Sequence, residues 1–415
     1  MLPPSADRLA LLYRISQDFN SSLDLDEVLN RVVDEVIAAV RGERGFLMLH
    51  DAAGQLHFRV ARGIDRNTIE QPQFQVSRSV IRRVAEEGRP LLTSNAQDDA
   101  TLKLQRSISM LGLRAILCVP LQLKGTMLGV IYVDNRLQSG VFYPDDLDLL
   151  TAIAASAATA IENARLYQLA VEKGRMEREL QMARDLQASL LPRETPQLAG
   201  WDFAGYWQPA RQVSGDFYDF IPTEQGVVVV IADVSDKGMP AALFMALSRT
   251  IVRASLIHTD GPADAMRHAN RLLYADSPNS MFVTLFVAQI DRTSGDLIYV
   301  NAGHNPPYLY RAVGDPPMRL TRTGMALGID DSLDFQQQVV HLDPGDALIL
   351  YTDGMLDALN ARGEEFGDER LRRVCVQHRT ESAAQIVAAL RDEVLRFVGD
   401  QPLADDCTVV IVKRV

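Results

Sequence analysis

The chain has 415 residues, of which 47% are hydrophobic and 23% are charged, so its composition is that of an ordinary soluble protein with two or three domains. The 54 acidic and 42 basic residues give a net charge of −12, which argues against a nucleic-acid-binding surface and against an anionic membrane surface as partner. The start of the chain lacks the pattern of a signal peptide, and no apolar run approaches the roughly 20 residues that span a bilayer. We therefore expect a cytoplasmic protein.

Three cysteines, Cys118, Cys375 and Cys407, are scattered along the chain without CxxC spacing. This spacing predicts neither a zinc site nor a disulfide framework. We expect all three to be buried, reduced thiols.

Helical and strand patterns alternate over the first 165 residues. Apolar residues three and four apart predict helices, alternating apolar residues predict strands, and Gly and Asp mark the turns between them. In chain order the expected elements are helices over 9–19 and 25–37, strands over 44–50 and 55–60, a helix over 77–87, a hairpin of 115–123 with 127–133, and a long helix from about 145.

This order of elements resembles a GAF domain over roughly residues 5–165. The specific parts are the hairpin, the Asp134-Asn135 pair that closes it, and the segment 142–150 that leads into an Ala-rich helix. The resemblance implies an N-terminal α/β sensor domain for a small-molecule or protein signal.

Particular GAF ligands are not supported by the residues at the expected positions. The cyclic-nucleotide subset carries an Asn-Lys-Phe-Asp-Glu signature, and here Leu147 stands in place of the Glu. Cys118 has no following His, which argues against a thioether-linked bilin. We interpret His50 and His57 as ordinary surface histidines rather than haem ligands.

From 161 to 191 the pattern stays helical and contains no proline. A heptad repeat can be laid on it, with Leu166, Lys173, Leu180 and Gln187 at the a positions and Leu169, Met176, Ala183 and Leu190 at the d positions. A dimeric coiled coil and a single helix packed on its own domain both fit this stripe. We favour the homodimer, in which polar a residues would fix the register.

The segment 198–415 alternates strands and helices again. We expect strands over 202–208, 217–221, 226–232, 281–290, 296–301, 307–312, 336–341, 346–352 and 408–413, and helices over 239–258, 262–276, 368–378 and 381–398. Short turns between neighbouring strands favour antiparallel sheets. The fold class is therefore α+β, with a C-terminal sandwich in which helices cover packed sheets.

Asp216, Asp233, Asp353 and Asp405 each stand beside an apolar, strand-like run of this segment. Clustered carboxylates raise each other's pKa unless cations neutralise them, and hard divalent cations with oxygen ligands are the usual remedy. Two such ions a few Å apart form a hydrolytic centre for phosphoryl groups. The pattern therefore favours a metal-dependent phosphatase.

Five motifs in this segment carry a closer resemblance, and they occur in the order 214–219 (SGDFYD), 232–242 (ADVSDKGMPAA), 301–307 (NAGHNPP), 351–357 (YTDGMLD) and 404–410 (ADDCTVV). Together they resemble the SpoIIE/RsbU branch of the PPM-type Ser/Thr protein phosphatases. The helix that precedes them, over 179–192, resembles the lead-in of that branch.

The resemblance implies a centre of two Mg²⁺ or Mn²⁺ ions. Asp233 would bridge the ions, and the backbone carbonyl of Val234 would complete one of them. Asp353 and Asp405 would hold the other ion, and Asp216 would bind a metal directly or through a water. A water between the ions would be the nucleophile.

Other polar residues near these motifs have competing interpretations. We prefer Asp405 to Asp406 because the first Asp of the pair is the ligand in the family. Asp219 fits a turn, a supporting role or a ligand, and we interpret His304 as structural rather than as a general acid. Lys237 fits either a phosphate contact or a solvated loop residue.

Asp236 departs from the family, which commonly has Gly at this position. Gly there indicates a backbone with φ > 0, which Asp tolerates better than most residues. The extra carboxylate could alter ion preference or turnover.

We therefore predict a GAF sensor over 1–165, a helical linker over 166–197 and a SpoIIE-like phosphatase domain over 198–415. The branch resemblance implies a phosphorylated STAS-type anti-anti-sigma protein as substrate, under control of the sensor. One alternative is a GAF-regulated scaffold that binds a phosphoprotein without turnover, and another is a hydrolase of small phosphate esters.

Overall fold

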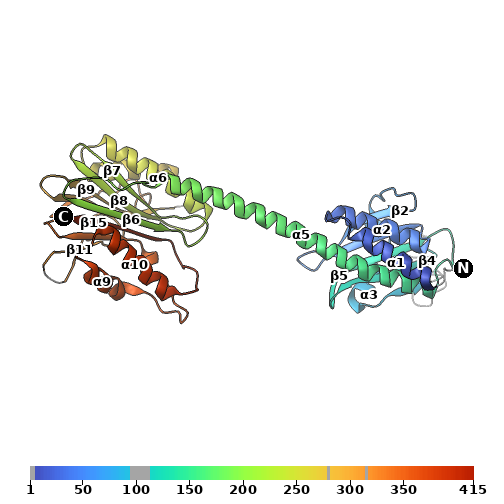
Figure 1. Cartoon of the computed structure of the whole chain (residues 1–415). Helices are drawn as coiled ribbons and strands as arrows, with labels where there is room; N and C mark the ends of the chain where they lie inside the picture. The colour runs from blue at the N-terminus through green and yellow to red at the C-terminus, as the bar shows by residue number, and fades with distance from the viewer. Residues whose placement is uncertain (1–4, 94–112, 278–280, 314–315) are drawn as a thin grey trace. The chain divides into compact units, whose positions relative to one another are not determined.

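The computed structural model describes residues 5–93, 113–277, 281–313 and 316–415. The chain forms two compact units, Met1–Arg175 and Met176–Val415 (Figure 1). Each unit has its own clusters of buried apolar side chains. The division falls inside one helix, α5 (Pro144–Leu190), so the helix predicted from about 145 and the helical pattern over 161–191 are one continuous element.

The first unit is a single antiparallel sheet with helices on both faces. Its elements are α1 (Ser5–Phe19), α2 (Leu25–Val40), β1 (Arg44–His50), β2 (Leu56–Gly63), the short helix η1 (Pro72–Phe74), α3 (Arg78–Glu87), β3 (Leu91–Thr93), β4 (Ala115–Leu123), β5 (Thr126–Asn135) and the start of α5. The strand order is β2-β1-β5-β4-β3. The predicted helices, strands and hairpin are confirmed, whereas β3 and η1 were not predicted because three residues carry no periodicity.

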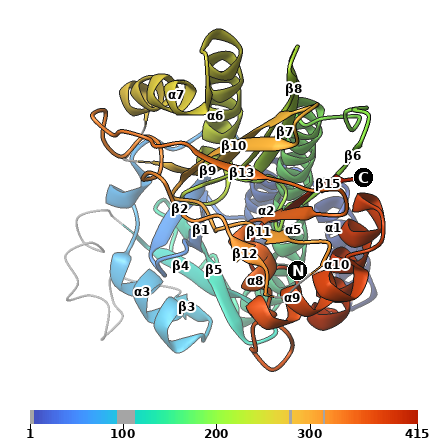
Figure 2. The same cartoon turned by 90° about the vertical axis from the view of Figure 1, so that its left-hand side faces the viewer.

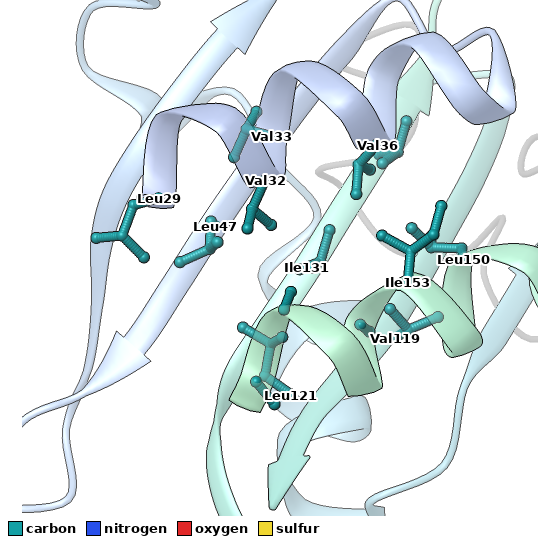
Figure 3. Close-up of a cluster of buried hydrophobic side chains, with 14 of the residues drawn as sticks. Leu29, Val32, Val33, Val36, Leu47, Val119, Leu121, Ile131, Leu150 and Ile153 are labelled. Carbon is teal, nitrogen blue, oxygen red and sulfur yellow. The ribbon is translucent and has the colours of Figure 1, made fainter. Parts of the chain in front are cut away.

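The larger core of this unit lies between the sheet and the helices α2 and α5. Asp24 caps α2, and the buried stripe of this helix faces the sheet. Figure 3 shows the packing, in which side chains of α2 meet those of β1, β4, β5 and α5: Leu29, Val32, Val33, Val36, Leu47, Val119, Leu121, Ile131, Leu150 and Ile153. A second cluster beneath α3 fills the opposite face of the sheet.

A buried ion pair joins the two central strands of this sheet. The guanidinium of Arg44 on β1 donates to both carboxylate oxygens of Asp134 on β5, at 2.8 and 2.5 Å. A buried charge needs such a partner, because an unpaired one is costly to desolvate. Asp134 of the Asp-Asn pair noted at the end of the hairpin therefore ties β1 to β5.

The second unit contains two five-stranded antiparallel sheets. Its elements after α5 are β6 (Trp201–Gln208), β7 (Phe217–Pro222), β8 (Gly226–Val234), α6 (Met239–His258), α7 (Pro262–Asp276), β9 (Val283–Asp291), β10 (Asp296–Ala302), β11 (Tyr308–Tyr310), β12 (Met318–Arg319), β13 (Gln338–His341), β14 (Ala347–Tyr351), α8 (Asp353–Leu356), α9 (Gly367–His378), α10 (Ala383–Val398) and β15 (Cys407–Arg414). The strand orders are β13-β10-β9-β8-β7 and β12-β11-β14-β15-β6. Every predicted strand and helix is present, with ends that differ by two residues or fewer, and only the very short β12 and α8 were not predicted.

The layers of this unit follow from where its apolar side chains lie. One core cluster fills the space between the two sheets, a second lies between the first sheet and α6 with α7, and a third lies between the second sheet and α9 with α10. Figures 1 and 2 show these helices on opposite sides of the paired sheets. The predicted α+β sandwich is confirmed, and Cys118, Cys375 and Cys407 are buried free thiols as expected.

Helix α6 corrects the expectation that no apolar run of the chain is long enough to span a bilayer. It is 20 residues long and, by length and composition alone, apolar enough to cross a membrane. However, its buried side chains belong to the core beneath the sheet, and its residues Arg249 and Arg253 pair with Asp219 of β7. We therefore describe α6 as a core helix of this unit.

Candidate metal centre

The four predicted ligands lie at neighbouring strand ends of both sheets. Asp216 directly precedes β7, and Asp233 lies near the end of β8. Their neighbours Phe217 and Ala232 are opposite each other in the sheet. Asp353 begins α8 after β14, and Asp405 precedes β15, which pairs with β14. The sandwich therefore brings carboxylates that are up to 189 positions apart to one edge of the second unit.

Asp216 is the most buried member of this group, with 1% of its surface exposed. Its Oδ2 accepts hydrogen bonds of 2.7 Å from the hydroxyls of Thr352 and Thr408. Burial, together with the charges of Asp233 and Asp406, raises the pKa of Asp216 well above its usual range. The two threonines thus fix the orientation of a carboxylate whose ionised form is disfavoured by burial and by neighbouring negative charge.

Asp233 is affected by the charges of several neighbouring aspartates. Burial raises its pKa to about 7, with further contributions from the negative charges of Asp353 and Asp405. The pKa of Asp353 is also raised, first by burial and then by Asp405 and Asp357. Shifts of this sign arise when anions crowd in a desolvated site, which is the environment that a divalent cation relieves.

The donors at this edge are carboxylate oxygens, which fit hard cations such as Mg²⁺ and Mn²⁺ rather than soft ones. Asp405 at present forms an ion pair of 2.7 Å with Lys237. Across the described ranges, no three His, Cys, Asp or Glu side chains gather closely enough to hold an ion as they stand. The chemistry of the donor set fits the ions.

Glycine at position 354 allows two of these segments to meet. A Cβ on Gly354 would lie 2.0 Å from the carbonyl oxygen of Asp406, which no real contact permits. The backbone at the start of α8 therefore packs directly on the loop that carries Asp405. This close approach explains the interaction between the Asp353 and Asp405 carboxylates.

The neighbouring aspartates 405 and 406 have different contacts. Both oxygens of Asp406 accept backbone hydrogen bonds of 2.8 Å, one from Ala210 and one from Gly215. Among the described residues, the carboxylate of Asp405 has no such backbone partner beyond its own neighbour Asp406. This arrangement supports Asp405 as the carboxylate available to a metal.

The contacts of Asp219 argue against a role as a metal ligand. Its buried carboxylate contacts Arg249 at 2.9 Å and Arg253 at 2.7 Å, both on α6. These contacts tie α6, the helix that follows the Asp233 segment, to strand β7.

His304 has the surroundings of a structural residue. It is 2% exposed, and its Nδ1 lies 2.9 Å from the hydroxyl of Thr284 on β9. Burial lowers its pKa to about 4, so the imidazolium form that would serve as a general acid is disfavoured near pH 7.

The backbone at Asp236 adopts φ of 78°, so the expectation of a positive φ at this position is confirmed. Its side chain accepts a hydrogen bond from the amide of Lys237 at 2.9 Å. The adjacent Lys237 is half exposed, and its ammonium group contacts the Asp405 carboxylate rather than solvent alone.

Thr352, Thr408 and Gln187 have roles that the sequence analysis did not assign. The two threonines hold Asp216, and the buried amide of Gln187 binds the backbone of Ser214. All three stand inside motifs that had been recognised, next to Asp353, after Asp405-Asp406 and in the lead-in helix. A signal was therefore present, but nothing in a single sequence tells a buried polar side chain from an exposed one.

A cavity of about 620 Å³ lies in the first unit between β1, β2 and α3. His50 and His57 both line it, as do Arg82 and Glu86. His57 forms an ion pair of 2.9 Å with Asp51 and is largely exposed, which agrees with the interpretation of a surface histidine.

Comparison with known proteins gives each unit a family. Residues 24–161 match the GAF domain, and residues 223–415 match the family described as Stage II sporulation protein E (SpoIIE). The chain is 30% identical to the phosphoserine phosphatase RsbU of Bacillus subtilis over 236 residues, which cover 57% of the chain and 70% of RsbU. The chain belongs to the SpoIIE family. The match to its SpoIIE domain contains Asp233, Asp353 and Asp405, whereas Asp216 lies just upstream of it.

A second relative has a different length. Protein IcfG of Synechocystis sp. is 32% identical over 264 residues, which cover 57% of this chain but only 41% of IcfG. The chain therefore spans less than half of this relative. Among solved structures, the SiaA-PP2C domain of Pseudomonas aeruginosa aligns with 59% of the chain and 99% of that domain, with a TM-score of 0.54 and 22% identity. This likeness supports a PP2C-like fold for the SpoIIE domain.

Proposed function

We propose that this chain is a metal-dependent phosphatase that hydrolyses phosphoserine or phosphothreonine on a protein. The observation that carries the proposal is the crowding of Asp216, Asp233 and Asp353, whose pKa values are all raised, in a chain related to the phosphoserine phosphatase RsbU. Acidic side chains of this kind suit cation binding better than acid–base chemistry of their own.

Two Mg²⁺ or Mn²⁺ ions would be held by the carboxylates of Asp216, Asp233, Asp353 and Asp405 and by the backbone carbonyl of Val234. Bound divalent cations at such a site lower the pKa of water and neutralise phosphoryl oxygens. Thr352 and Thr408 fix the orientation of the Asp216 carboxylate, and Asp406 braces the loop before it. No side chain of the chain is needed as a nucleophile.

The substrate class follows from the same resemblance. We propose a phosphorylated STAS-type anti-anti-sigma protein in a cytoplasmic partner-switching circuit, with a signal at the GAF domain as the controlling input. The scaffold alternative is not favoured, because a binding protein without turnover has no need of a complete carboxylate set at the strand ends.

A homodimer through α5 is part of this proposal. From 165 to 179 every residue of α5 except Gly174 is exposed, including the apolar residues Leu166, Leu169 and Met176. Exposed apolar side chains at heptad spacing are typical of a helix that pairs with a second helix. The last repeat of the predicted heptad is wrong, however, because Gln187 is buried within the second unit.

The proposed activity is tested by phosphate release from a phosphoserine peptide in the presence of Mn²⁺. The wild-type chain is compared with Asp233→Asn and with Glu224→Gln, an exposed acidic residue in the turn between β7 and β8. We expect Mn²⁺-dependent release in the wild type and in Glu224→Gln, and a loss of at least 100-fold in Asp233→Asn. Equal release by all three proteins would overturn the proposal.

A further inference from the structure

Gln187 is a buried polar residue near the end of a largely exposed helix. Its side chain is 5% exposed, whereas its neighbours Leu186 and Ala188 are exposed. Leu191, four positions later, belongs to the same core cluster as Phe244 of α6. One face at the end of α5 therefore enters the core of the SpoIIE domain, and Gln187 is the polar group on that face.

The side-chain amide of Gln187 is bonded to backbone groups. Its Oε1 accepts a hydrogen bond of 3.0 Å from the Ser214 amide, and its Nε2 donates to the Ser214 carbonyl at 2.9 Å. The same Nε2 donates to the carbonyl of Ala242 at 3.2 Å. A buried amide is costly to place without partners, and here both of its polar atoms are satisfied.

These bonds end on the two segments that frame the metal centre. Ser214 stands two residues before Asp216, and its hydroxyl accepts a hydrogen bond of 3.0 Å from the Asp216 amide. Ala242 lies in the first turn of α6, the helix that follows Asp233 and Val234 along the chain. One side chain of α5 thus holds the loop before Asp216 against the start of α6.

We propose that Gln187 is a positioning residue of the metal centre and the point at which α5 acts on it. Because Ser214 is bonded to Gln187 through both its amide and its carbonyl, a shift or rotation at the end of α5 moves the loop that presents Asp216. The inference rests on the proposed metal-dependent function for its consequence, and it names a contact through which the helix that begins in the first unit reaches the site.

The test uses the full chain with Gln187→Met, which keeps the length of the side chain and removes its hydrogen bonds. The matched control is Asn270→Ala, because Asn270 of α7 is also a fully buried amide bonded to backbone groups, the Asp330 carbonyl at 2.7 Å and the Gly328 amide at 2.9 Å. Neither of these partners lies in a segment that carries a predicted ligand. The two readouts are Mn²⁺ affinity by calorimetry and hydrogen exchange of the backbone amides over 211–217 in metal-free protein.

We expect Gln187→Met to weaken Mn²⁺ binding at least tenfold and to speed exchange over 211–217 at least tenfold, with both quantities within twofold of wild type in Asn270→Ala. Unchanged exchange and affinity in Gln187→Met, or the same losses in Asn270→Ala, would overturn the assignment. Failure of the proposed function has a separate signature, a wild-type chain that binds Mn²⁺ but releases no phosphate. If the wild type binds no Mn²⁺, the exchange of 211–217 alone decides the positioning role.

Discussion

The backbone amide of Gly215 donates a hydrogen bond of 2.8 Å to the carboxylate of Asp406, which joins two loops 191 positions apart. The other oxygen of this carboxylate accepts the amide of Ala210. Asp406 therefore braces the loop that leads to Asp216, while the adjacent Asp405 faces Lys237 and the acidic cluster. Two consecutive aspartates thus have separable tasks, one structural and one electrostatic.

Substitution of the two aspartates separates these tasks. Asp406→Ala leaves two backbone amides without their acceptor, which costs about 2 kcal/mol of unfolding free energy or more. Asp405→Asn removes a half-exposed carboxylate, so we expect stability within about 0.5 kcal/mol of wild type and Mn²⁺ affinity at least tenfold weaker. Urea unfolding and calorimetry measure the two effects. A large stability loss in Asp405→Asn with unchanged Mn²⁺ binding would reverse the assignment.

The raised pKa of Asp233 predicts a pH dependence of the metal-free protein. Between the unfolded pKa near 4 and the folded pKa of about 7, the folded state holds a proton that the unfolded state has released. Stability due to this group is therefore complete below about pH 4 and is lost as pH rises to 7, by about 4 kcal/mol. Asp233→Asn should flatten this part of the profile.

Thermal or urea unfolding from pH 4 to 8 in the presence of a chelator measures this effect. Added Mn²⁺ should restore the stability lost near pH 7, since a ligand of the folded state stabilises it by mass action. A wild-type profile that matches Asp233→Asn across this range would show that Asp233 titrates in the same way folded and unfolded.

The contacts of Asp219 predict a strong effect on stability. Asp219→Ala leaves the largely buried Arg249 without its partner, which we expect to cost about 3 kcal/mol. Arg253→Ala serves as the control, since Arg253 is more exposed and its loss leaves the pair of Asp219 and Arg249 in place. That variant should lose about 1 kcal/mol or less. Urea denaturation measures the loss of stability in both variants. Equal losses in Asp219→Ala and Arg253→Ala would contradict a dominant pairing of Asp219 with Arg249.

Asp236 predicts a gain in stability on replacement by glycine. A positive φ is strained for any residue with a Cβ, so Asp236→Gly should stabilise the protein by about 0.5–1 kcal/mol. Both variants lose the hydrogen bond to the Lys237 amide, but Asp236→Ala also keeps the strained Cβ, so this variant should be destabilised. The comparison of the two variants by chemical denaturation checks the backbone argument, and a loss of stability in both would contradict it.

The sequence predicted the fold well because its elements are long and strongly patterned. Helices α6 and α7 were predicted with the bounds that the structure shows, and strand β8 was evident from its buried run. The very short elements β3, β12 and α8 were missed, because two to four residues are too few to show either the helical or the strand periodicity of apolar residues. The long helix expected from about 145 and the helical pattern over 161–191 are confirmed as one element, α5.

The candidate site, too, could be predicted from the sequence only in part. The predicted acidic ligands stand out in the sequence because each follows or precedes an apolar run. The side chains that orient them do not stand out, because Thr352, Thr408 and Gln187 act through contacts between segments far apart in the chain. The choice between Asp405 and Asp406 depends on which carboxylate meets backbone amides, and only the folded chain shows this.

The exposed middle of α5 predicts a dimer that a single substitution weakens. Leu169 is 54% exposed at a d position of the heptad, so Leu169→Lys would place two charges in the seam of a paired helix. Gln168→Lys adds the same charge at a neighbouring exposed position outside the seam and is the matched control. We expect a dimer for the wild type and Gln168→Lys in sedimentation velocity, and a dissociation constant at least tenfold higher for Leu169→Lys. A monomeric wild type would contradict the proposed dimer and mean that α5 serves as a single helix.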